Sequence, residues 1–463
     1  MKTRRPFPFH VKHPSPARQL RWNTMAEHND PTQAISLDPW FNHYADRASG
    51  LSVSEVRALF AVASRPEVVS LAGGMPFVRG LPEGLVNSAL ETVMKTDGAT
   101  ALQYGSGQGT PRLREQILDV MRLEGIQGSV DDIVVTTGSQ QALDLVTKLF
   151  INPGDVILAE APSYVGAIGV FRSYQADIVH VLMDEHGLIP DALREKIRET
   201  KALGKNIKFL YTIPNFHNPA GVTLSAERRP EIVQICQEHN ILILEDNPYG
   251  LLSFDEPVPP ALRSYDDDGV IYLGSFSKFL APGFRVGWAL APHGIREKLV
   301  LAAEAAILCP SQFSQMVISE YMDQADWEAQ VSTFRDIYRE RRDTMNSALN
   351  EHLPELSWNV PNGGFYIWVT LPEGLDSKAM LPRAVTELVA YTPGTAFYAD
   401  GGGRQNIRLS YCYPTPENIK VGIRRLATVV NGELDLLADF AGTGTLTGGP
   451  DTGAVSAPPP NLS

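Results

Sequence analysis

The feature that most constrains the fold is an alternation of short apolar runs with helical patterns between about Asp97 and Pro292. Apolar residues recur at helical spacing between several runs, as in Ala142, Leu145 and Leu149. Strands joined by helices predict an α/β domain with a mostly parallel sheet that helices flank on both faces. We expect seven strands, which correspond to the runs DIVVTTG, DVILAEAP, IVHVLM, IKFLYTIP, ILILEDNPYG, VIYLGSFS and GWALAP.

The pattern changes after about Ile295 to long helices, followed by FYIWVTLP and NIRLSYCY, which alternate like strands of a smaller sheet. We expect a smaller α+β domain, formed by this C-terminal part and an N-terminal segment. The predicted division is a basic, disordered extension at 1–36, the N-terminal segment of the small domain at 37–90, the large domain at 91–295, the C-terminal small domain at 296–441 and a disordered tail at 442–463.

The first 24 residues carry six basic side chains, several prolines and no acidic residue. Because proline opposes an amphipathic helix, we expect a disordered extension here. A targeting peptide and a true start at Met25 are the alternatives.

The formal net charge of −13 argues against nucleic acid or an anionic membrane as the main partner. No apolar run is long enough to cross a membrane. The three cysteines, Cys236, Cys309 and Cys412, are widely spaced and lack the spacing of metal ligands. They support neither a disulfide framework nor a metal site, so we expect a cytoplasmic protein.

Ligands of parallel α/β sheets bind beyond the carboxyl ends of the strands. At the first such end, TTGSQQALDLV runs from a strand through Gly138 and Ser139 into a helix. The free amides and the positive dipole end of that helix would form an anion site. An ordinary serine N-cap is the alternative.

Three further strand ends carry polar or aromatic side chains. Tyr164 in EAPSYVG could stack on a flat ring or fill the core, and Asn218 in IPNFHNPAG lies in a tight turn whose chemistry alone could explain it. Asp246 ends the apolar strand of ILILEDNPYG, where a carboxylate is costly without a partner, so an ion pair is the alternative to a ligand. Tyr249 would project near the same pocket.

The stretch YLGSFSKFLAPGFRVGW places Ser275, Ser277 and Lys278 where a buried strand opens into a loop. A lysine that is partly desolvated and lies near the fixed charge of Arg285 loses preference for its ammonium form and can act as an amine nucleophile. A solvated surface lysine is the alternative.

Taken together and in this order, these motifs resemble the fold type I, class I and II aminotransferases that depend on pyridoxal 5′-phosphate. The sequence is most similar to the branch that contains 2-aminoadipate and kynurenine aminotransferases. The resemblance covers about Leu51 to Gly432.

This resemblance implies a role for each motif. Lys278 binds the cofactor aldehyde and carries the substrate proton, while Asp246 keeps the ring nitrogen protonated. Asn218 and Tyr249 bond the ring oxygen, and Tyr164 stacks on the ring. The phosphate is expected to be bound by Ser139, Gln140, Ser275, Ser277 and Arg285.

The resemblance also implies a homodimer with shared sites, because Tyr104 in QYGSGQG matches a tyrosine that reaches the neighbouring subunit's phosphate. Arg408 in NIRLSYCY matches the arginine that binds the substrate α-carboxylate as a planar fork. Gly74 matches a segment that covers the substrate. Arg57 matches a residue placed over acidic side chains, although an exposed arginine that balances nearby acids fits the sequence equally.

The expected reaction moves an amino group from an L-amino acid to a 2-oxo acid, with 2-oxoglutarate as acceptor, in a ping-pong sequence. Asn247 and Gly250 depart from the family's usual residues without removing a catalytic group. A carbon–sulfur lyase on the same scaffold would share every cofactor residue and is the alternative. A regulator derived from this family is disfavoured by the acidic charge and by the lack of a helix-turn-helix pattern.

Overall fold

The computed structural model describes residues 38, 40–51 and 65–443. The chain divides into two units, residues 1–46 and 47–463, and each is described by itself. In the first unit, the ring of Trp40 packs edge-on against His43, with centroids 5.7 Å apart, around the short 3₁₀ helix η2 (Phe41–His43). The predicted extension at 1–36, residues 444–463 of the predicted tail and Arg57 lie outside the described residues, whereas Gly442 and Thr443 belong to a helix.

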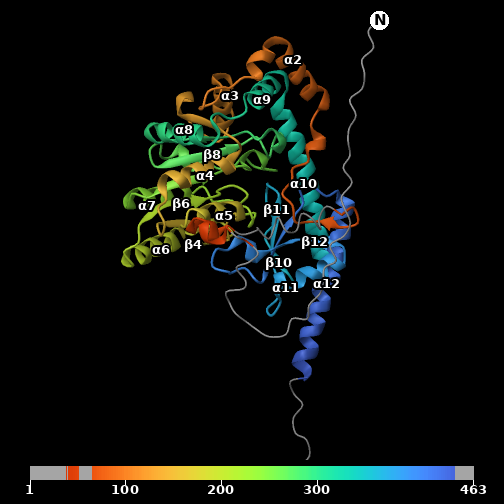
Figure 1. The fold of residues 1–463 in the computed structure, drawn as a ribbon. Coiled ribbons are helices and arrows are strands. Elements are labelled where there is room, and N and C mark those ends of the chain that lie inside the picture. Colours follow the sequence, from red (N-terminus) through yellow and green to blue (C-terminus); the bar gives the residue numbers. More distant parts are fainter. Residues whose placement is uncertain (1–37, 39, 52–64, 444–463) are drawn as a thin grey trace, which may run out of the picture. The chain divides into compact units, whose positions relative to one another are not determined.

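The second unit contains a large sheet of eight strands (Figure 1). In their order across the sheet, the strands are β2 (Ile133–Thr136), β9 (Gly287–Leu290), β8 (Val270–Ser275), β7 (Leu242–Asp246), β6 (Ile207–Thr212), β3 (Val156–Ala161), β4 (Asp177–Asp184) and β5 (Gly187–Leu188).

All seven predicted runs form strands of this sheet, which confirms the α/β class. The eighth strand, β5, is a two-residue edge that pairs antiparallel with β4. Strands β8, β7, β6, β3 and β4 are parallel neighbours. Because β9 is antiparallel to both β8 and β2, β2 runs in the same direction as β8. The carboxyl ends of β2, β8, β7, β6 and β3 therefore share one edge of the sheet.

Successive side chains of a strand point to opposite faces of the sheet. Because the strands carry apolar side chains on both faces, helices cover both faces. Ile157 and Ala159 of β3 pack with α4 (Ser139–Phe150), α5 (Val165–Ser173) and α8 (His293–Ile307). Val156 and Leu158 pack with α6 (Pro190–Ala202) and α7 (Arg228–His239) on the other face. Near-continuous burial on both faces explains why these strands are apolar throughout.

A second, four-stranded antiparallel sheet has the order β10 (Ser357–Trp358), β11 (Tyr366–Thr370), β14 (Asn406–Ser410) and β13 (Thr392–Pro393). A separate parallel pair joins β1 (Val69–Ser70) to β12 (Val389–Ala390), so chain from the N-terminal part pairs with the C-terminal part. The remaining helices are α2 (Glu83–Ala101), α3 (Pro111–Arg122), α9 (Gln312–Gln324), α10 (Trp327–His352), α11 (Ser377–Thr386) and α12 (Pro416–Thr443).

Short 3₁₀ helices complete the fold: η3 (Asp46–Gly50), η4 (Val78–Gly80), η5 (Val130–Asp132), η6 (Gly250–Leu252), η7 (Leu262–Ser264), η8 (Pro282–Phe284) and η9 (Gly394–Phe397). Helix α10 packs along α12, whereas α8 packs on α4, and α9 packs on α2 and α3. The four-stranded antiparallel sheet confirms the smaller sheet that was expected beside the large one. The predicted residue boundaries of the domains stay predictions. Within the described ranges, no helix is long and apolar enough to cross a membrane.

Candidate active site

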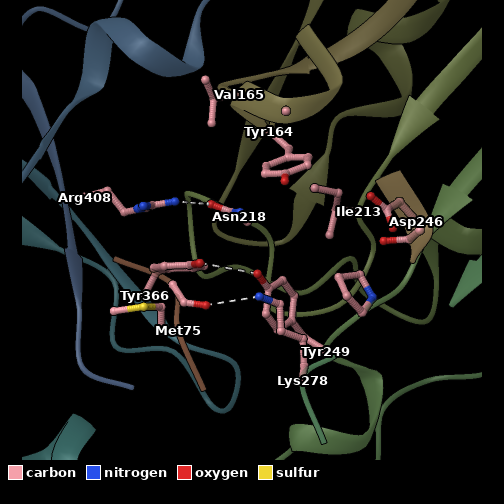
Figure 2. A pocket seen from close by; sticks show the side chains of 14 residues that line it. Met75, Tyr164, Val165, Ile213, Asn218, Asp246, Tyr249, Lys278, Tyr366 and Arg408 are labelled. Carbon is pink, nitrogen blue, oxygen red and sulfur yellow. Dashed lines mark hydrogen bonds between the residues drawn. The ribbon is translucent and has the colours of Figure 1, made fainter. Parts of the chain in front are cut away.

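A cavity of about 560 Å³ lies at the carboxyl edge of the large sheet, between that edge and the smaller sheet (Figure 2). The large-sheet side contributes Ser139, Tyr164, Asn218, Asp246, Tyr249 and Lys278. The opposite side contributes Gly74 and Arg408. Residues far apart in the sequence thus share one cavity, and eight of the predicted site residues line it.

Lys278 follows strand β8, and its side chain points into the cavity beneath two aromatic rings. Its Nζ donates a 3.1 Å hydrogen bond to the Gly74 carbonyl and lies 5.9 Å from the ring centre of Tyr249 and 5.6 Å from that of Phe365. Burial lowers the pKa of Lys278, and the positive charges of Arg408 and Arg285 act in the same direction. The neutral, nucleophilic amine therefore makes up a larger fraction of Lys278 than of a lysine on the surface.

Asp246 ends strand β7 inside the protein and is 3% exposed. Its Oδ2 accepts a 2.8 Å hydrogen bond from the hydroxyl of Tyr211, whereas its Oδ1 has no partner in the described part of the chain. Burial raises the pKa of Asp246 to about 6, against the opposing effects of Tyr211 and Lys278. A buried carboxylate oxygen without a partner fits a ligand that brings a proton, as the protonated ring nitrogen of the expected cofactor would.

The start of helix α4 and the loop after β8 form the side of the site expected to bind phosphate. The N-cap of α4 is Gly138, at φ 77°, where a Cβ atom would overlap the guanidinium of Arg285. Arg285 donates a 3.2 Å hydrogen bond to the Thr137 carbonyl. Free amides at a helix start beside an arginine fit an anionic group.

Two serines lie at the end of β8 near this helix start. The hydroxyl of Ser275 donates to Ser277 Oγ at 2.8 Å and accepts from the Ser277 amide at 3.0 Å. Gln140 accepts a 3.3 Å hydrogen bond from the Tyr164 hydroxyl and donates to the Gly166 carbonyl at 3.1 Å. Burial raises the pKa of Tyr164 to about 12, so its phenol is neutral at physiological pH.

Arg408 reaches the cavity from β14 and lies between two aromatic rings. Its Nη1 donates to Asn218 Oδ1 at 2.8 Å, and its Nη2 donates to the Ala72 carbonyl at 2.7 Å. The guanidinium carbon lies 4.2 Å from the ring centre of Tyr366 and 4.8 Å from that of Phe397. These contacts fix the orientation of the guanidinium plane and leave Nε of Arg408 without a protein partner among the described residues.

The segment around Gly74 lines the cavity, and its carbonyl groups accept hydrogen bonds from the side chains of Lys278 and Arg408. The buried thiol of Cys412 also donates to the Met75 carbonyl at 3.1 Å. A Cβ atom on Gly74 would overlap the hydroxyl of Tyr366. Glycine is therefore required for the backbone to approach this closely.

Asn247 and Gly250, which depart from the residues usual in the family, both have structural reasons. Asn247 is buried, donates to Glu124 Oε2 at 2.7 Å and accepts from Asn215 at 3.1 Å. A Cβ atom on Gly250 would come close to the Glu124 carboxylate, but Gly250 itself lies in η6 without a positive φ. Both residues thus adapt the loop after β7 to a buried glutamate.

Not every predicted residue lines the cavity. Four predicted phosphate contacts are not among its lining residues: Gln140, Ser275, Ser277 and Arg285. Tyr104 is 76% exposed, and Arg57 lies outside the described residues. Sequence reasoning missed Tyr211 and Tyr366, because each lies in a strand pattern that reads as ordinary core. Among the residues that the structure describes, no group of three His, Cys, Asp or Glu side chains could hold a metal ion.

Comparison with known proteins supports this site. The sequence profile of aminotransferase class I and II matches residues 69–426. The chain is 41% identical to aromatic-amino-acid aminotransferase 1 of Thermococcus litoralis over 87% of this chain and 97% of that protein.

Two solved structures are similar in fold and sequence. The kynurenine aminotransferase of Pyrococcus horikoshii, crystallised with PMP, shares 39% identity at a TM-score of 0.81, over 85% of this chain and 98% of that one. The α-aminoadipate aminotransferase of Thermus thermophilus, complexed with N-(5′-phosphopyridoxyl)-L-leucine, shares 35% identity at a TM-score of 0.79, over 86% and 99%. The chain therefore belongs to the class I and II aminotransferases, which use pyridoxal 5′-phosphate as cofactor.

Proposed function

We propose that this transaminase moves the amino group of an L-amino acid to 2-oxoglutarate in two alternating half-reactions. The observation that carries the proposal is the pairing of Lys278, whose pKa is lowered, with the partnerless Oδ1 of Asp246 in one cavity of the described chain. An amine nucleophile and a carboxylate that can hold a ring proton are the two groups that this chemistry requires.

Pyridoxal 5′-phosphate supplies an aldehyde that binds amines and a ring that withdraws electrons when its nitrogen is protonated. Lys278 would bind this aldehyde through Nζ and, as a free amine, would remove the proton from the substrate α-carbon. Asp246 keeps a proton at the ring nitrogen, and the bond from Tyr211 orients its carboxylate.

The other residues bind and orient. Asn218 and Tyr249 would bind the ring oxygen of the cofactor, and Tyr164 would pack against its ring. The residues that would bind the phosphate lie around the start of α4 and are Ser139, Gln140, Ser275, Ser277 and Arg285. Arg408 binds the α-carboxylate that every amino-acid and 2-oxo-acid substrate shares.

The same proposal includes a homodimer with Tyr104 reaching the partner subunit's phosphate. The 76% exposure of Tyr104 in this chain supports it, because that side chain is free for an intermolecular contact. Arg57 remains the proposed contact for acidic substrate side chains, beyond the described residues. Three cysteines without a disulfide fit a cytoplasmic location.

A panel of amino donors tests the proposal. The donors are 2-aminoadipate, kynurenine, phenylalanine and leucine, each assayed against 2-oxoglutarate and pyruvate, with the new amino acid and the new oxo acid both quantified. Transfer gives the two products in equal amounts and requires an acceptor. A sulfur amino acid incubated without any acceptor completes the panel, and release of pyruvate and ammonia from it would identify a lyase instead.

A further inference from the structure

Tyr366 is a buried residue at the centre of the site that has no role so far. It begins strand β11, is 3% exposed and lines the cavity between Arg408 and Tyr249. Figure 2 shows its ring beside the Arg408 side chain and its hydroxyl directed at Tyr249. The ring of Tyr366 contacts Arg408, the proposed substrate contact, and its hydroxyl contacts Tyr249, a proposed cofactor contact.

The hydroxyl end meets a second phenol. The hydroxyl of Tyr249 donates a hydrogen bond to Tyr366 Oη at 3.5 Å, and in the described part of the chain neither hydroxyl has another hydrogen-bond partner. A phenol carries one proton and can also accept a bond. When Tyr249 turns its proton toward a ligand in the cavity, its oxygen becomes free to accept the proton of Tyr366. A donor that itself accepts a hydrogen bond is a stronger donor.

The position of the Tyr366 hydroxyl is fixed from the opposite side. A Cβ atom on Gly74 would overlap it, so the backbone of the segment around Gly74 packs directly against this oxygen. Burial raises the pKa of Tyr366, which keeps its proton in place as a donor. The hydroxyl therefore has little freedom to turn away from Tyr249.

The ring end meets the guanidinium of Arg408. The guanidinium carbon lies 4.2 Å from the Tyr366 ring centre, within the range of a cation–π contact. Phe397 lies 4.8 Å from the same carbon, so two aromatic rings hold one planar group. The plane of the guanidinium decides how it meets a carboxylate with two parallel bonds.

We propose that Tyr366 is a positioning residue with two separable parts: a hydroxyl that directs the Tyr249 proton toward the ring oxygen of the cofactor, and a ring that sets the plane of Arg408 for the substrate α-carboxylate. This inference rests on the proposed function, which gives Tyr249 and Arg408 their roles. It adds a residue that the motifs of the sequence did not single out.

Two substitutions in the full-length, cofactor-loaded protein separate the parts. Tyr366→Phe removes only the hydroxyl, and Tyr366→Leu also removes the ring. The first readout is a pH titration of the visible absorbance of the lysine-bound cofactor, which reports the proton held near the ring oxygen. The second is KM for an amino acid and for 2-oxoglutarate, and the third is the affinity of the cofactor-free protein for the cofactor.

We expect Tyr366→Phe to raise the pKa of that absorbance change, because a ring oxygen that receives a weaker hydrogen bond is more basic. The proton affinity should rise about two- to tenfold, the scale of one neutral hydrogen bond, while KM changes little. Tyr366→Leu should show the same spectral change and, in addition, raise KM for both substrates about three- to thirtyfold, because both carry the α-carboxylate.

Tyr391→Phe is the matched control, since its hydroxyl is also buried and donates a 2.6 Å bond to the Ser377 carbonyl outside the cavity. It should leave the absorbance titration and both KM values unchanged. Tyr366→Met replaces the leucine variant if that protein does not fold.

A wild-type absorbance titration for Tyr366→Phe would overturn the role of the hydroxyl. KM values that are equal in the phenylalanine and leucine variants would overturn the role of the ring. Failure of the unsubstituted protein to bind pyridoxal 5′-phosphate or to transaminate would instead refute the proposed function, and the two failures are therefore distinguishable.

Discussion

The hydroxyl of Tyr211 donates a 2.8 Å hydrogen bond to Asp246 Oδ2 from the neighbouring strand, and Asp246 Oδ1 is left without a partner among the described residues. Burial raises the pKa of Tyr211 well above its ordinary value, so this phenol keeps its proton at neutral pH and donates it to the carboxylate. The hydrogen bond therefore fixes the orientation of the carboxylate and favours its ionised form against the effect of burial on its pKa. Its consequences are testable from either partner.

Asp246→Asn should preserve the contact with Tyr211 but lose the negative charge. We expect kcat to fall about 100-fold or more, because a neutral amide does not hold a proton at the ring nitrogen. Tyr211→Phe should have a smaller effect of the same kind: the pKa of Asp246 rises further above about 6, and cofactor affinity falls about tenfold. Single-turnover rates and cofactor titrations measure both effects. An Asp246→Asn enzyme with the normal rate would show that another carboxylate serves the ring.

Lys278→Ala should fold and retain the cofactor pocket but should not turn over. The visible absorbance of the lysine-bound cofactor should disappear, since no other lysine lines the described cavity. Absorbance spectra and a stopped assay with 2-oxoglutarate check both points. The exposed Lys298→Ala is the control and should behave like the unsubstituted protein. Turnover by Lys278→Ala at the normal rate would contradict the assignment.

Arg408→Lys keeps the positive charge but loses the planar fork. We expect KM to rise about 10- to 100-fold for every amino acid and for 2-oxoglutarate alike, because all of them share the α-carboxylate. Arg404→Lys is the control, since that arginine is exposed and pairs with Asp376 at 3.4 Å. A KM increase confined to acidic substrates would mean that Arg408 contacts the side chain instead.

Much of the fold and site follows from local sequence patterns. All seven apolar runs form strands, and in six of them near-continuous burial on both faces leaves a continuous apolar signal, whereas β4 is only partly buried. Lys278 and Asp246 were found because a charged residue at the end of such a run is unusual. Tyr211 and Tyr366 were missed for the opposite reason, since a tyrosine within a strand fits a core position equally well.

Contacts between residues far apart in the chain also could not be predicted from the sequence. Arg408 and Asn218 are 190 residues apart and meet only because the smaller sheet faces the carboxyl edge of the large one. The two-residue strand β5 was too short for a periodic signal. In both cases the deciding information is tertiary packing, which no local window of sequence contains.

Glu124 gives a prediction about stability and pH. It is 5% exposed, and its carboxylate accepts hydrogen bonds of 2.6 Å from Tyr272 and 2.7 Å from Asn247. Burial nevertheless raises its pKa to about 7 from an ordinary value of 4.5. The folded state thus holds this proton more tightly than the unfolded state. The stabilising contribution of the protonated form is complete below about pH 4.5 and is lost as the pH rises to about 7.

Glu124→Gln should abolish this loss, because glutamine does not titrate. As the pH rises from 5 to 8, the unsubstituted protein should lose up to about 3 kcal/mol of free energy of unfolding that the variant keeps. Urea unfolding of the cofactor-free protein at the two pH values measures the difference, with the exposed Glu195→Gln as control. An equal pH dependence in the variant and the unsubstituted protein would mean that Glu124 stays ionised in the fold, in which case its bonds with Tyr272 and Asn247 outweigh the cost of burial.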